Sequence, residues 1–279
     1  MDLIFTKSKW EMWDDPLEEF LQRAVADGFD AVEIFLPAQP ESASEIAQRV
    51  ADHGLLLVAQ IITEGDTPAE HIAVMRDRFA FAVETKPLLV NSHTGSDVFS
   101  FEENCEIFRV ACELAESAGI LFTHETHRGR LTSSGPQTKR LLEAIPELRL
   151  NADFSHWFCV HESDLSNQGE NVELAIQRSS HIHARVGFSE GPQVPDPLAP
   201  EYSEWTELHL ALWRRIIKAR QSAGAEFLTI TPEFGPPPYM PVEPFSGRPL
   251  ADAWEVNVRF NAYLKSALKT NENLVGTFA

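Results

Sequence analysis

Short apolar runs alternate with longer amphipathic segments along the chain. The runs are rich in β-branched and aromatic residues, as expected of buried strands. The segments between them carry apolar residues at three- and four-residue spacings, which indicates helices. The predicted strands are residues 3–6, 31–36, 55–62, 88–92, 120–125, 148–153, 181–186 and 228–233. Their starts follow one another at roughly thirty residues, the size of a βα unit that joins parallel strands.

Eight such units predict one (β/α)8 TIM barrel, an α/β fold, as a single domain over residues 1–279. The predicted helices are residues 16–28, 43–54, 70–86, 101–119, 135–147, 208–224 and 250–268, the last closing the ring. An open doubly wound sheet is the alternative, because alternation alone does not show closure. No glycine-rich phosphate-binding motif follows the first strand, which weakens its nucleotide-binding version. Long proline- and glycine-rich loops, 188–204 and 234–249, follow the last two strands and are predicted to act as lids.

Composition and charge narrow the class of protein. The chain has 42 acidic and 23 basic residues, so its formal charge of −19 disfavours nucleic acid as a partner. Its three cysteines, Cys105, Cys112 and Cys159, form no CxxC pair, so neither a disulfide framework nor a thiolate zinc site is expected. The sequence begins without a signal-peptide pattern and contains no apolar run long enough to span a membrane. We therefore expect a cytoplasmic protein without a membrane partner.

Metal-binding residue types follow the last four predicted strands. The fifth strand runs into THETHRG, where β-strand alternation turns Glu125 and His127 to one face and His124 to the other. Active sites of TIM barrels lie at the carboxyl ends of the strands. There the chain offers one candidate ligand per strand, namely Glu125, Asp153, His183 and Glu233. Three carboxylates and one imidazole suit one divalent cation such as Mn²⁺, Mg²⁺ or Co²⁺, with Zn²⁺ as a further option.

Each of these residues also has an ordinary structural interpretation. Glu125 alone is more often a solvated rim residue, Asp153 could cap a helix, and His93 could cap a turn. His181 shares a face with His183 and becomes the ligand if the strand ends earlier, whereas a one-residue shift turns both away. Arg185 could pair with Glu33 or Glu64. What favours a site is convergence, because ligand-type residues follow four consecutive strands.

The motifs HETH, NADFSHW, HIHAR and PEFG at four strand ends resemble the sugar isomerase and epimerase superfamily with the xylose-isomerase-like barrel. The superfamily also includes dehydratases and abasic-site endonucleases. The resemblance implies that Glu125, Asp153, His183 and Glu233 bind one divalent metal, that His156 lies beside the substrate, and that Arg185 holds a substrate oxygen. His93 and His127 are further candidate substrate contacts, and homo-oligomers are common in the families concerned.

The chemistry implied is isomerisation or epimerisation of a small sugar or related polyhydroxy carbonyl compound. A metal chelated by a carbonyl and its neighbouring hydroxyl stabilises an enediolate, while Glu125 and Glu233 exchange protons on opposite faces. Elimination of water from the same species would make the enzyme a dehydratase, so a lyase stays open. Phosphodiester hydrolysis of the abasic-site endonuclease type and a non-catalytic scaffold are weaker alternatives. Arg128, Arg130 and Arg185 are the nearby cations, which favours an unphosphorylated substrate. Four aromatic residues near strand ends could wall the pocket, although such residues more often pack in a core or a lid: Trp10, Trp13, Phe35 and Trp157.

Overall fold

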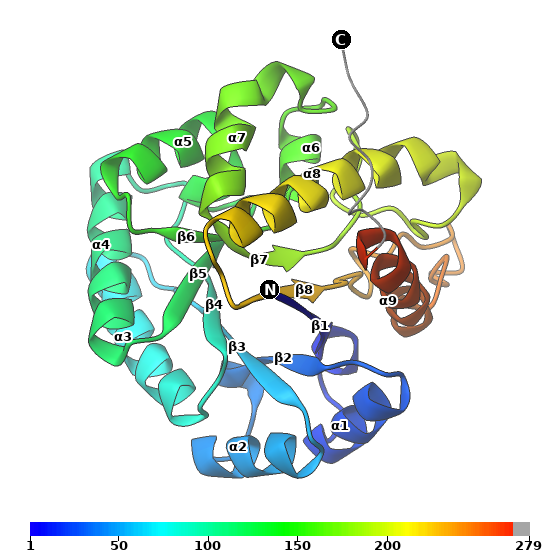
Figure 1. Cartoon of the computed structure of the whole chain (residues 1–279), viewed down its shortest axis with the longest axis horizontal. Coiled ribbons are helices and arrows are strands. Elements are labelled where there is room, and N and C mark those ends of the chain that lie inside the picture. Colours follow the sequence, from blue (N-terminus) through cyan, green and yellow to red (C-terminus); the bar gives the residue numbers. More distant parts are fainter. Residues whose placement is uncertain (270–279) are drawn as a thin grey trace.

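The computed structural model describes residues 1–269, in which eight parallel strands form a closed barrel in chain order, with β8 paired to β1. Figure 1 looks along this barrel, with the N-terminus near its centre and the helices around it. The strands are β1 (Asp2–Ser8), β2 (Ala31–Phe35), β3 (Leu56–Ile62), β4 (Leu89–His93), β5 (Leu121–Glu125), β6 (Arg149–Ala152), β7 (Ser179–His183) and β8 (Phe227–Thr231). The predicted (β/α)8 barrel is therefore confirmed, and residues 270–279 of the predicted domain lie outside the described residues.

The helices form the outer layer. They are α1 (Leu17–Ala26), α2 (Ala43–Asp52), α3 (Pro68–Glu84), α4 (Phe101–Ala118), α5 (Gly135–Ala144), α6 (Ser155–Val160), α7 (Gly169–Arg178), α8 (Ser203–Ser222) and α9 (Ala253–Lys269). Ser42, Thr67 and Ser100 begin α2, α3 and α4 with capping boxes, in which the glutamate three residues on reaches back to the cap. Gly119 ends α4 with φ of +63°, a conformation that glycine adopts without steric cost.

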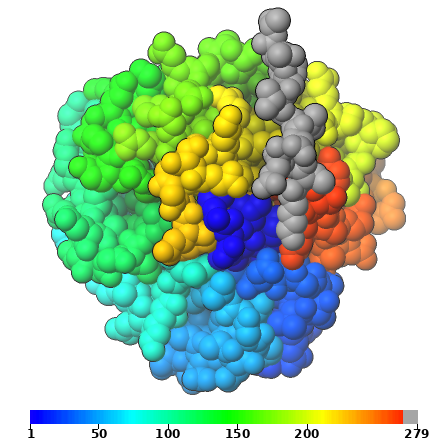
Figure 2. All heavy atoms as spheres, in the orientation of Figure 1, coloured from blue at the N-terminus to red at the C-terminus, as the bar shows by residue number. Residues whose placement is uncertain are grey.

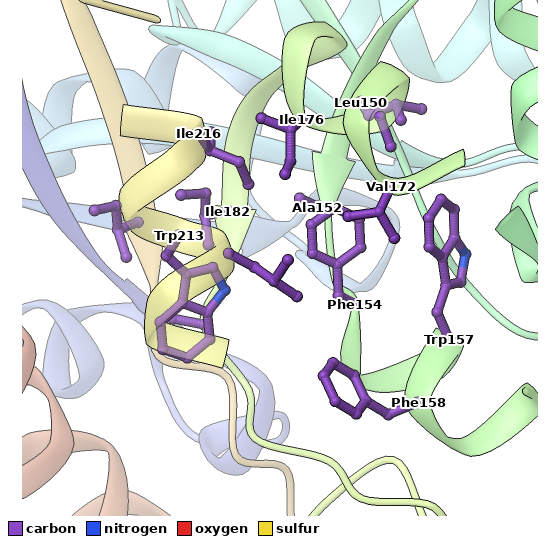
Figure 3. Packing of buried hydrophobic residues seen from close by; sticks show 14 of the residues in the cluster. Leu150, Ala152, Phe154, Trp157, Phe158, Val172, Ile176, Ile182, Trp213 and Ile216 are labelled. Carbon is purple, nitrogen blue, oxygen red and sulfur yellow. The ribbon is translucent and has the colours of Figure 1, made fainter. Parts of the chain in front are cut away.

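Strand alternation divides polar from apolar side chains. In β7, His181 and His183 face the barrel interior, whereas Ile182 packs outward in the apolar cluster beneath α7 and α8, as Figure 3 shows. In β6, Leu150 and Ala152 belong to the same outer layer. The hydrophobic core thus lies between the barrel and the helices, while much of the barrel interior is polar. Figure 2 shows atoms of β1 filling the centre of the amino-terminal end.

Two predicted boundaries differ from the structure in ways that matter for the site. β7 and β8 end at His183 and Thr231, so Arg185 and Glu233 lie just past the strands rather than within them. The predicted loop 188–204 is confirmed except for its end, where the short helix η5 (Pro200–Tyr202) leads into α8. No helix within residues 1–269 is long and apolar enough to cross a membrane.

Candidate metal centre and its cavity

Four side chains converge at the carboxyl end of the barrel. Glu125, Asp153, His183 and Glu233 each offer one ligand atom, and these atoms all lie within 4.8 Å of one another. They come from the ends of β5, β6, β7 and β8, and all four residues are buried. The Nδ1 atom of His183 lies 3.2 Å from Oε2 of Glu125 and 2.9 Å from Oε2 of Glu233. The structure therefore brings together the four residues that the sequence analysis grouped.

The cluster contains buried polar atoms that lack a hydrogen-bond partner. Oε1 of Glu125 and Nδ1 of His183 are both in this state, although charged neighbours lie close to them. Buried polar atoms are nearly always satisfied, so such atoms in one cluster point to a bound group. Three carboxylates and an imidazole nitrogen are the donors that Mn²⁺, Mg²⁺ and Co²⁺ accept. The residues present fit a divalent cation at this position.

Proximity of opposite charges sets the protonation of the cluster. Burial alone would lower the pKa of His183, but Glu233, Glu33 and Glu125 raise it well above its usual value. Burial alone would raise the pKa of Glu125, but His93 and His183 hold it well below its usual range. Burial raises the pKa of Asp153 to about 6, against the opposing effect of Arg185. His183 is therefore protonated and Glu125 ionised. A cation bound here would displace the proton on Nδ1 of His183, the ring nitrogen that faces Glu125 and Glu233.

Arg185 is a fully buried guanidinium that holds the other side of Asp153. Its Nη2 atom forms a short ion pair with Oδ2 of Asp153 and lies 2.9 Å from Nε2 of His156. Its Nε atom donates to Oγ of Ser155 at 3.2 Å, and its Nη1 atom lies 3.7 Å from Glu233. The alternative pairing of Arg185 with Glu33 or Glu64 is therefore wrong, and Glu64 pairs with Arg78 instead.

Three histidines stand in a row along one side of the cluster. The ring of His127 lies 4.5 Å from that of His93 and 4.1 Å from that of His156, between centroids. Nε2 of His93 lies 2.8 Å from Oε2 of Glu125, and Nε2 of His156 lies 4.0 Å from Oε1. Burial lowers the pKa of His127 to about 3, and burial together with His127 lowers that of His156 well below its usual value. His127 and His156 are therefore uncharged near neutral pH.

A cavity of about 250 Å³ opens onto this cluster. Glu125, Glu233, Arg185, His93 and His127 line it together with an aromatic wall formed by Trp10, Trp13, Phe35 and Tyr239. The ring of Trp13 stacks on Phe35 at 5.0 Å, and Trp10 meets Tyr239 edge to face at 4.9 Å. Trp157 does not line the cavity, so the packing alternative holds for this residue: α6 turns it into the core, where its Nε1 donates to the carbonyl of Thr132.

His124 and His181, the other two histidines of β5 and β7, lie outside the four-residue cluster. His124 faces outward from β5 against Phe108 of α4, as predicted, and burial lowers its pKa to about 3. His181 lies deeper in the barrel than His183, and its Nδ1 atom lies 2.6 Å from Oγ1 of Thr229, so it is not part of the four-residue cluster.

Two contributors were missed by sequence reasoning. Tyr239 comes from the proline-rich loop after β8, where no periodicity indicates direction. Glu33 was considered only as a possible partner of Arg185; a carboxylate within an apolar strand was the available signal, and the structure buries it.

The model of the xylose-isomerase-like TIM-barrel family matches residues 21–191, more than half of the chain. The chain belongs to this family. No curated protein sequence matches it. Several solved structures share its fold. A probable 3-DHS dehydratase from Bacillus anthracis has a TM-score of 0.64 and 16% identity, over 98% of this chain and 100% of its own.

Other similar structures have different activities in their names. A D-allulose 3-epimerase from Methylomonas sp. has a TM-score of 0.63 and 14% identity, over 95% of this chain and 97% of its own. An endonuclease IV from Thermus thermophilus has a TM-score of 0.58 and 16% identity, over 94% of this chain and 99% of its own. At such identities the similarity shows the fold alone, so the activity has to be argued from the site.

Proposed function

We propose that this protein is a divalent-metal-dependent isomerase or epimerase of a small, unphosphorylated sugar or related polyhydroxy carbonyl compound. The observation that carries the proposal is the four-ligand cluster at the floor of an aromatic cavity, with two of its carboxylates lining that cavity. When bound, a divalent cation would polarise a carbonyl and its neighbouring hydroxyl and so acidify the adjacent C–H.

The chain's own residues would handle the protons. Glu125 and Glu233 come from β5 and from the end of β8, so they reach the cavity from separate strands and can face opposite sides of a bound substrate. One carboxylate would remove a proton and the other would return one on the second face. Nε2 of His93 lies close enough to Glu125 to hold it in place. In Arg185, Nη2 and Nε are engaged by other side chains, so Nη1 would be the donor to a single substrate oxygen.

The cations of the cavity favour an uncharged substrate. Lys9 and Arg185 are the cationic side chains among the lining residues. The ammonium of Lys9 already donates to the carbonyls of Met12 and Trp13, at 2.8 and 3.0 Å, and Arg185 is paired with Asp153. A phosphate would need donors that are free to turn toward it. The aromatic wall instead suits the C–H faces of a sugar or cyclic polyol.

The test is solvent deuterium incorporation, followed by NMR, into a panel of unphosphorylated ketoses and keto-cyclitols with Mn²⁺ present. Glu125→Gln and Glu233→Gln should each slow exchange by about 10²–10⁴-fold, the usual contribution of a positioned acid or base. Glu102→Gln, on the exposed side of α4, is the control that should leave exchange unchanged. If deuterium exchange in both cavity variants is as fast as in the protein without substitutions, the proposed roles of Glu125 and Glu233 are refuted. A product that has lost water would identify the enzyme as a dehydratase.

Metal-dependent phosphodiester hydrolysis is the second candidate, and one observation favours it. His93, Glu125 and His127 also present ligand atoms within 4.8 Å of one another, beside the first cluster. A second cation there would create a two-metal site of the kind that stabilises both oxygens of an in-line displacement. Nδ1 of His127 is hydrogen-bonded to the carbonyl of Arg128, which leaves Nε2 as its candidate ligand atom. Two or more zinc ions per chain and cleavage of an abasic duplex would establish this function instead.

A further inference from the structure

A buried carboxylate lies on the far side of His183 from the proposed metal centre. Glu33 of β2 is 1% exposed and is not part of the cavity lining. Its Oε1 and Oε2 atoms lie 3.0 and 3.1 Å from Nε2 of His183, whose other ring nitrogen, Nδ1, faces Glu125 and Glu233. The imidazole of His183 therefore connects Glu33, deep in the barrel, to the metal-binding cluster.

Glu33 is surrounded by donors from three other strands. The amide of Asn91 on β4 donates to Oε1 at 3.0 Å, and the hydroxyl of Thr231 on β8 donates to Oε2 at 2.8 Å. Nε2 of His181 on β7 lies 3.3 Å from Oε2. Donors on several sides hold the carboxylate rigidly in one place, and an ionised carboxylate can only accept hydrogen bonds. Nε2 of His183 must therefore carry its proton toward Glu33, which leaves Nδ1 for the cluster.

We propose that Glu33 is a positioning residue that fixes the ring orientation and tautomer of His183 so that Nδ1 presents its lone pair to a divalent cation. The inference rests on the metal centre of the proposed function. A carboxylate behind a ligating histidine makes the imidazole a stronger ligand, and loss of such a partner typically weakens metal binding by about 10–100-fold. Glu33, His181 and His183 could alternatively hold a cation of their own, since their ligand atoms also lie within 4.8 Å of one another. The donors already bonded to Glu33 favour the hydrogen-bonded arrangement.

The experiment measures Mn²⁺ affinity and stoichiometry by titration calorimetry in the full chain and in Glu33→Gln. Glutamine keeps the size of the side chain but loses the charge, and its amide can turn a donor toward Nε2 and so favour the wrong tautomer of His183. We expect Mn²⁺ to bind Glu33→Gln at least about 10-fold more weakly than it binds the protein without substitutions. The second readout is the Nε2–H proton of His183 in the ¹⁵N-histidine spectrum of the Mg²⁺-bound protein, which Glu33→Gln should shift or remove. His209→Gln is the control, because His209 is equally buried but lies on α8 away from the barrel interior.

The outcomes separate this inference from the proposed function. Affinity in Glu33→Gln within twofold of the unchanged protein would overturn the positioning role while leaving the metal centre intact. Loss of one of two bound ions would overturn it in favour of an inner cation site. If the unchanged protein binds no divalent cation, both proposals fail. If the protein without substitutions binds one divalent cation and Glu33→Gln weakens that binding, but no sugar exchanges deuterium, the positioning role stands and the proposed function fails.

Discussion

Removal of the Arg185 guanidinium should destabilise the metal-free protein strongly. Arg185→Gln deletes the short ion pair with Asp153 and the contacts with Ser155 Oγ, at 3.2 Å, and His156 Nε2, at 2.9 Å. All of these groups are buried, so their charges and polar atoms are poorly solvated once the guanidinium is gone. Breaking a buried ion pair from one side costs about 3–5 kcal/mol, because the remaining charge is left unpaired. We expect a loss of that size in the free energy of unfolding, measured by urea denaturation with EDTA present.

A double-mutant cycle tests whether the Arg185–Asp153 ion pair accounts for the lost stability. Asp153→Asn should cost a similar amount by removing the closest partner of the guanidinium and leaving Glu233 at 3.7 Å, and the double variant should lose less than the sum by about 2–3 kcal/mol. Arg215→Gln, which breaks the half-exposed pair with Glu173 at 2.7 Å, is the matched control and should cost less than about 1 kcal/mol. Additive losses in the cycle, or an Arg185→Gln effect no larger than that of the control, would refute the reasoning.

Two further predictions concern the cavity wall and the response to acid. Gly235→Ala should destabilise the protein by about 1–3 kcal/mol and raise KM, because the new Cβ would lie 2.3 Å from ring atoms of Trp10 in the cavity wall; unchanged stability and KM would contradict this. Burial lowers the pKa of His209 to about 4, and the neutral ring donates from Nδ1 to the Trp205 carbonyl while Nε2 accepts from Gly187 N–H. The unfolded chain then binds one more proton than the folded one between about pH 6.5 and pH 4, so stability should fall as pH falls through this window, by up to about 1.4 kcal/mol per pH unit from His209. The free energy of unfolding, measured by denaturation at several pH values, should depend less steeply on pH in His209→Gln than in the protein without substitutions. An identical dependence would contradict the low pKa assigned to His209.

The four-residue cluster could be predicted because it depends on information that is local in the sequence. Strand periodicity locates each strand to within a few residues, and a parallel barrel brings all carboxyl ends to one edge. Glu125, Asp153, His183 and Glu233 could therefore be grouped without knowing any contact between them. The outward direction of His124 followed from the same alternation.

The supporting contacts could not be predicted because they join distant parts of the chain. Glu33 meets His183 across the barrel interior, 150 residues away, and nothing near Glu33 in the sequence indicates that partner. Tyr239 lies in a loop where proline replaces periodicity. The sequence left Trp157 between the cavity wall and the core, because the direction of its indole depends on the short helix α6, which follows β6 directly and turns it into the core.

Metal content per chain tests the central claim most directly. The purified, untagged protein would be reconstituted with Mn²⁺, Co²⁺ or Mg²⁺, dialysed and measured by elemental mass spectrometry beside Asp153→Asn and Glu233→Gln. The four-ligand centre predicts about one ion per chain in the unchanged protein and a marked loss in both variants, each checked for folding by circular dichroism. No retained ion in the unchanged protein, or equal retention in folded variants, would contradict a metal centre built from Glu125, Asp153, His183 and Glu233.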